Sequence, residues 1–243
     1  MNVISHIVEP DRLLLTWQGQ EGSSRARRVV GELRRNADGV SFHYLRATPD
    51  FEAAQNEGFQ GFPAFKVDDR IHVSDVLEAF LRRLPPRTRS DFGEYLRQQR
   101  IDPFTEISDF ALLGYTAARL PGDSFALVHT FDEASGPFEF VTEVAGFRYA
   151  SSLGVEAVHV GTPVTFQPEP SNRVDPKAIR VMYGPEVLGY VNRCQTGMFA
   201  RHLAERSISA VVDRVNGRPD RASIYLFVKV DSAAGLPVTR RVA

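Results

Sequence analysis

The stretch that decides the fold of this chain is residues 163–193, PVTFQPEPSNRVDPKAIRVMYGPEVLGYVNR. It begins with a strand-like alternation and, after a polar interruption, continues with an apolar-rich run at residues 178–183. The dipeptide Gly184-Pro185 separates that run from a second one at residues 187–191. Two short apolar runs on either side of a glycine-containing turn predict a β-hairpin.

The polar loop before this hairpin carries an unusual density of functional groups. An amide, a carboxylate and two cationic side chains fall within six residues, at Asn172, Arg173, Asp175 and Lys177. A buried loop would leave such groups without hydrogen-bond partners, at a cost of several kcal/mol each. We therefore expect the loop to be exposed and to be a candidate for function.

The spacing of residues in this stretch resembles the HIRAN domain. The matching positions are Glu169-Pro170, Asn172, Asp175, Ala178-Ile179, Val181 and Gly189-Tyr190-Val191. An earlier segment, residues 144–149 (VAGFRY), resembles the first strand of that family, and the likeness covers roughly residues 139–230. The resemblance implies a small OB-like β-barrel with a flanking helix, whose activity is to bind the 3′ end of single-stranded DNA.

Two residues of the polar loop could recognise the end of a DNA strand. The terminal hydroxyl needs a hydrogen-bond acceptor, which Asp175 offers, and Asn172 can both donate and accept beside it. The alternative is that each residue only stabilises a turn, as asparagine and aspartate often do. Both roles can hold for the same side chain, so the sequence leaves the two interpretations open.

Cations and aromatic rings near the hairpin suit the rest of a single strand. Arg148, Lys177 and Arg193 are available for phosphates. Tyr149 and Tyr190 offer flat rings on which bases stack, with a contribution of roughly 1–3 kcal/mol per base. The alternative for both tyrosines is an ordinary half-buried position in the barrel.

The family resemblance places Arg148, Tyr149, Asn172, Asp175 and Arg193 on positions used for DNA. Two other positions depart from the family pattern. Val174 stands where an aromatic residue is expected, and Tyr190 replaces a histidine. Strand alternation places Ile179 and Val181 inside the hairpin and Arg180 outside, and we favour Arg193 over Arg180 as a DNA contact.

Composition limits the class of protein. The 243 residues are 43% apolar and 24% charged, which is typical of a soluble globular protein of one or two domains. No apolar run approaches the ~18 residues of a membrane-spanning helix, and the N-terminus lacks the features of a signal peptide. With Cys194 as the single cysteine, we expect no internal disulfide and a reducing, cytoplasmic location.

Charge is distributed unevenly along the chain. The net charge of the whole chain is −1. Residues 141–230 contain 11 Lys and Arg against 8 Asp and Glu, a balance of +3, and the remaining residues contain 18 against 22, a balance of −4. The sign favours contact of the second part with a polyanion, although the small excess predicts a modest and salt-sensitive affinity.

The first part of the chain predicts a domain of both strands and helices. Its strands are expected at residues 12–17, 25–35, 40–45 and 124–128. Its helices are expected at residues 74–84 with Ser74 as the N-cap, from about residue 91, and at residues 108–118. This order predicts an α+β domain at residues 1–131.

Residues 10–130 are similar to the N-terminal subdomain of HipA-like toxin kinases. The likeness rests on Val30-Gly31-Glu32-Leu33, Phe42-His43-Tyr44, residues 81–89, residues 109–114 and Leu120-Pro121-Gly122-Asp123. In that family the subdomain is a non-catalytic lobe that contacts an antitoxin or the kinase core. The resemblance implies a partner-binding role, within a toxin–antitoxin or genome-defence system.

The second part continues beyond the hairpin with a helix and two strands. We expect the helix at residues 195–206 and the strands at residues 208–215 and 222–230, around an Asn216-Gly217 turn. These elements complete a domain at residues 138–230, an OB-like barrel by resemblance, and residues 231–243 are expected to form a loose tail. The chain as a whole is therefore predicted to be α+β with two domains.

Motifs for catalysis are missing from the sequence. The six histidines are scattered, without the spacing of metal ligands, and no glycine-rich nucleotide loop or nucleophile elbow occurs. We therefore expect no metal, no cofactor and no enzymatic activity. The leading hypothesis is a DNA-binding protein whose first domain docks a protein partner. The alternatives are an interaction module without DNA binding and a metal-dependent nuclease.

Overall fold

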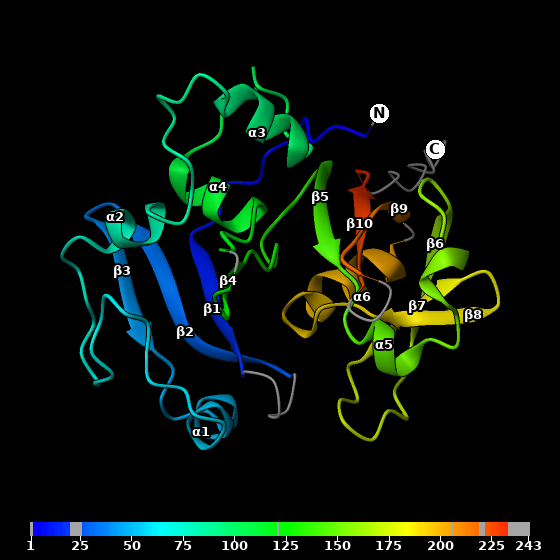
Figure 1. Cartoon of the computed structure of the whole chain (residues 1–243), viewed down its shortest axis with the longest axis horizontal. Coiled ribbons are helices and arrows are strands. Elements are labelled where there is room, and N and C mark those ends of the chain that lie inside the picture. Colours follow the sequence, from blue (N-terminus) through cyan, green and yellow to red (C-terminus); the bar gives the residue numbers. More distant parts are fainter. Residues whose placement is uncertain (1, 20–25, 121, 206, 219–221, 233–243) are drawn as a thin grey trace, which may run out of the picture. The chain divides into compact units, whose positions relative to one another are not determined.

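The computed structural model describes residues 2–19, 26–120, 122–205, 207–218 and 222–232. Most of the tail predicted at residues 231–243 lies outside these ranges. The described residues form two compact units, the first comprising residues 7–131 and the second comprising residues 2–6 together with 132–232. Each unit contains helices and one antiparallel sheet, which confirms the predicted α+β class (Figure 1).

The first unit is built on a four-stranded antiparallel sheet in the order β3-β2-β1-β4. Its strands are β1 (Arg12–Gln18), β2 (Arg27–Asn36), β3 (Gly39–Tyr44) and β4 (Phe125–Val128). Apolar alternation explains these elements, since Leu13, Leu15 and Phe42 are fully buried in one aromatic-rich core. All four strands lie where the sequence pattern predicts them.

The helices of this unit agree less closely with the predictions. They are α1 (Pro49–Asn56), α2 (Val76–Leu81), α3 (Phe92–Gln98) and α4 (Asp109–Tyr115). Helix α2 is shorter than predicted, because the chain enters it through a left-handed Asp75 (φ 54°) and leaves it at Arg82. Asp75 is the N-cap residue and makes no side-chain capping bond, so the prediction of Ser74 as the cap was wrong.

Helix α1 was not predicted, although the sequence contains the signals for it. The side chain of Thr48 accepts a hydrogen bond from the backbone N–H of Phe51, and Pro49 occupies the first turn. A threonine cap followed by proline is a common helix start. The short apolar face of this helix, mainly Phe51 and Ala54, hides the periodicity on which a longer helix would be recognised.

The second unit contains a six-stranded antiparallel sheet in the order β5-β10-β9-β6-β7-β8. Its strands are β5 (Phe138–Glu143), β6 (Pro163–Pro168), β7 (Ile179–Tyr183), β8 (Glu186–Tyr190), β9 (Ile208–Asn216) and β10 (Ser223–Val230). The predicted hairpin is confirmed as β7 and β8, joined through a left-handed Gly184 (φ 59°). The predicted strands at residues 208–215 and 222–230 are likewise β9 and β10.

The predicted barrel is not confirmed, because the ladders formed by the described residues leave β5 and β8 as the two edges of the sheet. One bridge spans these edges: the backbone groups of Ala145 and Tyr190 exchange two hydrogen bonds of 2.8 Å. This approach requires glycine at position 189, since a Cβ there would lie 2.6 Å from the carbonyl oxygen of Ala145. The edges are thus joined at a single point.

Short helical segments complete the second unit. They are α5 (Phe147–Ala150), the 3₁₀ turns η1 (Val155–Ala157) and η2 (Arg193–Gln195), and α6 (Thr196–Ala204). The buried Phe199 anchors α6, with its ring 4.8 Å from that of Phe166 and 6.1 Å from that of Phe140. The structure confirms the helix predicted over residues 195–206.

Helix α5 corrects the assignment of residues 144–149 to a strand. The extended chain ends at Ala145, because Gly146 adopts a left-handed conformation (φ 72°) and turns the backbone into the helix. Phe147 is buried below it, and Arg148 and Tyr149 follow on the helix. The two candidate DNA contacts therefore lie on a helical turn and not on a strand.

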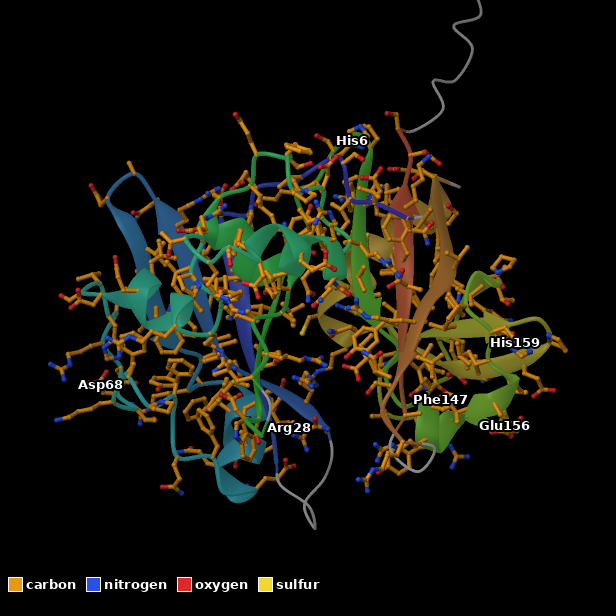
Figure 2. The ribbon with its side chains drawn as sticks, turned by 45° about the horizontal axis from the view of Figure 1, so that its top comes forward. His6, Arg28, Asp68, Phe147, Glu156 and His159 are labelled. Atoms are coloured by element: carbon orange, nitrogen blue, oxygen red, sulfur yellow. The ribbon has the colours of Figure 1, made fainter. Side chains whose placement is uncertain are left out.

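The N-terminal residues belong to the second unit and not to the first. Ile4 is fully buried, and the backbone N–H groups of Ser5 and His6 donate to one carboxylate oxygen of Glu139, at 3.1 and 3.0 Å (Figure 2). The other oxygen of Glu139 lies 3.0 Å from Nδ1 of His6. Where the sequence suggested one domain for residues 1–131, the structure groups residues 2–6 with strand β5.

Candidate nucleic-acid interface

The loop between β6 and β7 is held together by the carboxylate of Glu169. This group accepts a hydrogen bond of 2.8 Å from Nδ2 of Asn172, forms an ion pair with Arg180 and lies close to the hydroxyl of Tyr190. The backbone N–H of Glu169 donates to the carbonyl of Ala178 at 2.8 Å, which closes the base of the loop. One side chain therefore connects the loop to both strands of the hairpin.

The surroundings of Glu169 favour its charged form. Its side chain is only 13% exposed. The guanidinium of Arg180 and the amide of Asn172 nonetheless hold the pKa of this carboxyl below its ordinary value of 4.5, because their hydrogen bonds outweigh the effect of burial. The loop is thus tied down by a carboxylate that stays ionised at neutral pH.

The register of the sheet brings Arg180 and Tyr190 together. They are directly opposite each other in the β7–β8 pair, so their side chains project from the same face, and Ile179 and Val181 are buried on the other. This confirms the outward direction predicted for Arg180. No role was predicted for Glu169 or Arg180 from the sequence, although the shared face of Arg180 and Tyr190 in the hairpin was a signal that could have revealed one.

Asn172 and Asp175 both stabilise turns, as the alternative interpretation proposed. Oδ1 of Asn172 accepts hydrogen bonds from the backbone N–H groups of Val174 (2.9 Å) and Asp175 (3.1 Å). Oδ1 of Asp175 accepts one from the backbone N–H of Lys177 (2.8 Å). No described residue hydrogen bonds to Oδ2 of the half-buried Asp175, so this oxygen remains an acceptor for a ligand.

Helix α5 lies beside strand β8 (Figure 1). Gly146, which begins the helix, is next to the ring of Tyr190, since a Cβ at this glycine would lie 3.9 Å from Cδ2 of the tyrosine. Arg148 is exposed, and the side chain of Tyr149 is 76% exposed. The structure therefore places both residues on a helix that packs against β8.

Tyr190 and Arg193 differ in how accessible they are. Tyr190 is half-buried, with its hydroxyl close to Glu169 and its ring beside Gly146, so it offers less free ring surface than the sequence suggested. Arg193 is exposed at the start of η2, which Asn192 caps by accepting a hydrogen bond from the backbone N–H of Cys194. Arg193 is three residues beyond Tyr190 in the chain.

The predicted site residues therefore form a connected group, which we call the β8 corner. Its members are Arg148, Tyr149, Asn172, Asp175, Lys177, Tyr190 and Arg193. Three of them lie in the loop closed by Glu169, which lies close to Tyr190, and two lie on helix α5 beside β8. Arg193 follows directly where β8 ends.

The charge around the β8 corner is mixed, with cations in excess. Arg148, Arg173, Lys177 and Arg193 are exposed. Glu186 is an acid on β8, and its carboxylate accepts a hydrogen bond of 2.8 Å from Ser152, which ties the segment after α5 to the hairpin. Glu156 of η1 is a further exposed acid of this unit. The corner is cationic enough for a phosphate chain without being strongly basic.

Within the residues that the structure describes, no cluster of histidine, cysteine, aspartate or glutamate side chains has an arrangement that would hold a metal ion. No helix in those residues has both the length and the apolar character needed to cross a membrane.

Replacing Glu169 with glutamine is expected to loosen the loop. The amide retains the shape of the side chain but not the charge that binds Arg180, so amide hydrogen exchange at residues 172–178 should accelerate about tenfold. Lowering the pH should act in the same direction on the wild type. A carboxyl with a lowered pKa stabilises the folded loop above its ordinary pKa of 4.5, and this stabilisation is lost as the pH falls through the lowered value.

The exposed Glu156 supplies the control for this experiment, because a Glu156→Gln variant changes the net charge equally on the same unit. Exchange rates in the loop should match the wild type in that variant. Unchanged exchange in Glu169→Gln would show that the ion pair does not hold the loop.

Comparisons with known proteins place this corner within a described family. Residues 137–232 match the family model of the HIRAN domain, which confirms the resemblance expected over residues 139–230. Among solved structures, the HIRAN domain of human HLTF is similar, with 24% sequence identity over 38% of this chain and 74% of that chain, and a TM-score of 0.32. No curated protein matches the chain. The likeness of residues 10–130 to the HipA subdomain is not shown by these comparisons and stays a prediction.

Proposed function

With a HIRAN domain at residues 137–232 as the premise, we propose that this protein binds single-stranded DNA at its 3′ end and acts without catalysing a reaction. The observation that carries the proposal is that the family match includes the whole β8 corner. HIRAN domains resembling this one bind such ends. The polar loop, the exposed cations and the exposed ring of the corner are chemically suited to a strand end.

The loop residues would recognise the terminal nucleotide. Oδ2 of Asp175 is the acceptor for the 3′-hydroxyl, while its Oδ1 continues to hold the turn through Lys177. Asn172 keeps this turn in shape through its two backbone contacts. A 3′-phosphate would bring negative charge against the carboxylate, so the arrangement favours a free hydroxyl.

Phosphates and bases farther along the strand would use the remaining residues. Arg148, Lys177 and Arg193 are exposed cations for the phosphates. Tyr149 is the ring most open for stacking, and Val174, 95% exposed at the loop tip, offers an apolar contact without a ring. With a single open ring, the affinity depends chiefly on the cations, and it should be modest and sensitive to salt.

The first unit supports a different role, the docking of a protein partner. Several of its surface arginines are already paired with acids within the same unit, as in the pairs Arg87–Asp109, Arg89–Asp91 and Arg97–Glu94. Such pairing leaves little net positive charge for DNA. Together with the likeness to a HipA-type lobe, this favours binding of a protein over binding of nucleic acid.

End recognition is tested by comparing two oligonucleotides that differ only at the 3′ end. In fluorescence anisotropy, a 3′-hydroxyl strand should bind the full chain about tenfold more tightly than a 3′-phosphate strand. An Asp175→Asn variant retains an oxygen for the turn at Lys177 but loses the negative charge. In this variant the ratio of the affinities for the 3′-hydroxyl and 3′-phosphate strands should therefore fall to near one.

The test of end recognition depends on the difference in affinity between the 3′-hydroxyl and 3′-phosphate strands, and not on the affinity for either strand alone. Equal binding of both strands by the wild type would exclude end recognition. No binding of either strand at low salt would select the interaction module instead. Cleavage of labelled DNA in the presence of Mg²⁺ or Mn²⁺ would select the nuclease.

A further inference from the structure

A short extended segment of the first unit, residues 70–73, lies along the edge strand β3. Its residue His72 exchanges two backbone hydrogen bonds with Phe42, of 2.8 and 2.9 Å, as antiparallel neighbours do. The ring of His72 lies 6.0 Å from that of Phe42 and 5.0 Å from that of Phe65, on the core side of the sheet. We call residues 70–73 the edge segment, and Asp68, labelled in Figure 2, lies just before it. Its position is fixed through His72.

The side of the edge segment that points away from β3 presents open backbone groups. When a residue of an antiparallel pair exchanges both hydrogen bonds with its partner, the N–H and C=O groups of its two chain neighbours point the other way. These neighbours are Ile71 and Val73, and no described residue hydrogen bonds to their backbone groups. Each of the two residues therefore offers one donor and one acceptor to a further strand.

The side chains of the same two residues are apolar and open to solvent. Successive residues of an extended chain alternate between faces, so Ile71 and Val73 share the face opposite to His72. Ile71 is 64% exposed and Val73 is 70% exposed. Soluble proteins usually protect a sheet edge with charges, prolines or bulges. Two exposed β-branched residues beside open backbone groups instead favour the addition of a strand.

Charge is balanced before the edge segment and negative after it. The acids on the first side, Asp68 and Asp69, form ion pairs with arginines, at 2.8 and 2.5 Å. The acids on the second side, Asp75 and Glu78, are exposed, and neither forms an ion pair with a described residue. An incoming strand is therefore favoured when a lysine or arginine lies at the end that meets Asp75.

We propose that the first unit binds its protein partner at the edge segment, by pairing with an extended strand of that protein. The partner strand has alternating apolar residues and a basic residue near its N-terminus, since antiparallel addition places that end beside Asp75. The main-chain hydrogen bonds supply affinity, and Ile71 and Val73 supply the apolar contacts. The inference rests on the docking role in the proposed function and deepens it, because it names the surface and the chemistry of the partner.

A second copy of this chain fits the same edge less well. Symmetric antiparallel pairing of two edge segments about His72 would set Asp69 of one copy opposite Asp75 of the other. Like charges directly opposite each other destabilise a pair of strands. The charges therefore favour a different protein, one whose strand is basic.

The test uses the full chain and two labelled peptides of alternating valine and threonine. One peptide begins with two lysines, and the other begins with two glutamates. In fluorescence anisotropy the lysine peptide should bind the wild type about fivefold more tightly than the glutamate peptide. With the lysine peptide in excess, hydrogen exchange at the amides of Ile71 and Val73 should slow about tenfold, because both become hydrogen-bond donors to the peptide.

Two substitutions of matched charge locate the binding surface. Val73→Lys places a repelling charge on the edge and should weaken binding of the lysine peptide about tenfold. The control is Phe104→Lys, which introduces the same charge at another apolar residue of the same unit, one that is 92% exposed. This control should retain the wild-type affinity within about twofold.

The possible outcomes separate this inference from the proposed function. Equal binding of the lysine peptide by the wild type and by Val73→Lys would show that the edge segment is not the docking surface, while the docking role would stand. If neither peptide binds the wild type, the inference fails, and binding of the 3′-hydroxyl DNA strand by the same preparation shows whether the DNA-binding function holds. A dimer of the wild type that Val73→Lys dissociates would assign the edge to a second copy and would also overturn the inference.

Discussion

A Gly189→Val variant is expected to lose about 3 kcal/mol of the folding stability of the second unit. A Cβ at this position would lie 2.6 Å from the carbonyl oxygen of Ala145 and 2.6 Å from Cγ1 of Val144. The collision is with backbone, which cannot rotate away, so β8 must separate from the segment before α5. The bridge between Ala145 and Tyr190 would then open, and the helix carrying Arg148 would leave the β8 corner.

The effects of the substitution on the two units can be measured separately. The single tryptophan, Trp17, lies in the first unit, so its fluorescence should report unchanged unfolding there. Hydrogen exchange of peptides from β7 and β8 should accelerate roughly a hundredfold, and binding of single-stranded DNA should be lost.

Gly197→Ala is the control for this substitution, because a Cβ at position 197 would make only an ordinary van der Waals contact of 3.8 Å, with Oδ1 of Asp132, and the change should stabilise the helix slightly. Exchange in β7 and β8 should remain slow in that variant. Wild-type exchange rates in Gly189→Val would show that the two edges of the sheet do not depend on their close approach.

Removal of the two exposed arginines that flank β8 should have the largest effect on DNA affinity. In the Arg148→Ala/Arg193→Ala variant, two phosphate contacts are lost, and the affinity for single-stranded DNA should fall by about tenfold or more at low salt. The slope of log affinity against log salt should become shallower by about 0.7 for each lost contact. Anisotropy titrations over a series of salt concentrations measure both effects.

The control must alter charge equally on the same unit. Arg218→Ala/Lys229→Ala removes two exposed cations from the β9–β10 region and none from the β8 corner. In this control variant, the slope of log affinity against log salt should stay within error of the wild-type slope. Equal losses in both double variants would show that only the overall charge matters, and the β8 corner would no longer be a defined site.

Local patterns in the sequence were sufficient to predict the hairpin and the direction of its side chains. Alternation placed Ile179 and Val181 inside and Arg180 outside, and Gly184 marked the turn. These features depend on residues that are neighbours in the chain, so a short window contains all the information. The same is true of the turns made by Asn172 and Asp175, whose partners lie two or three residues away.

Prediction from the sequence was less successful where the conformation of a segment depends on residues that are distant in the chain. The segment at residues 144–149 reads as a strand, but its course is decided by Gly146 and by β8, more than forty residues later, through the bridge at Tyr190. The missed helix α1 has weak periodicity of its own, and the periodic helix α2 is shortened because Asp75 is left-handed and the helix ends at Arg82. In each case the local preference is small and packing decides the outcome.

The sequence by itself determined that this chain has an α+β fold with a HIRAN-like second part, and which residues could contact a strand end. Only the tertiary structure decided how those residues are held: Glu169 joins the loop to Arg180 and Tyr190, and Glu139 binds residues 5 and 6. The physical reason is that each of these features needs groups from separate strands or helices to meet. Their meeting depends on how the sheet and helices pack, and no periodicity within one segment records it.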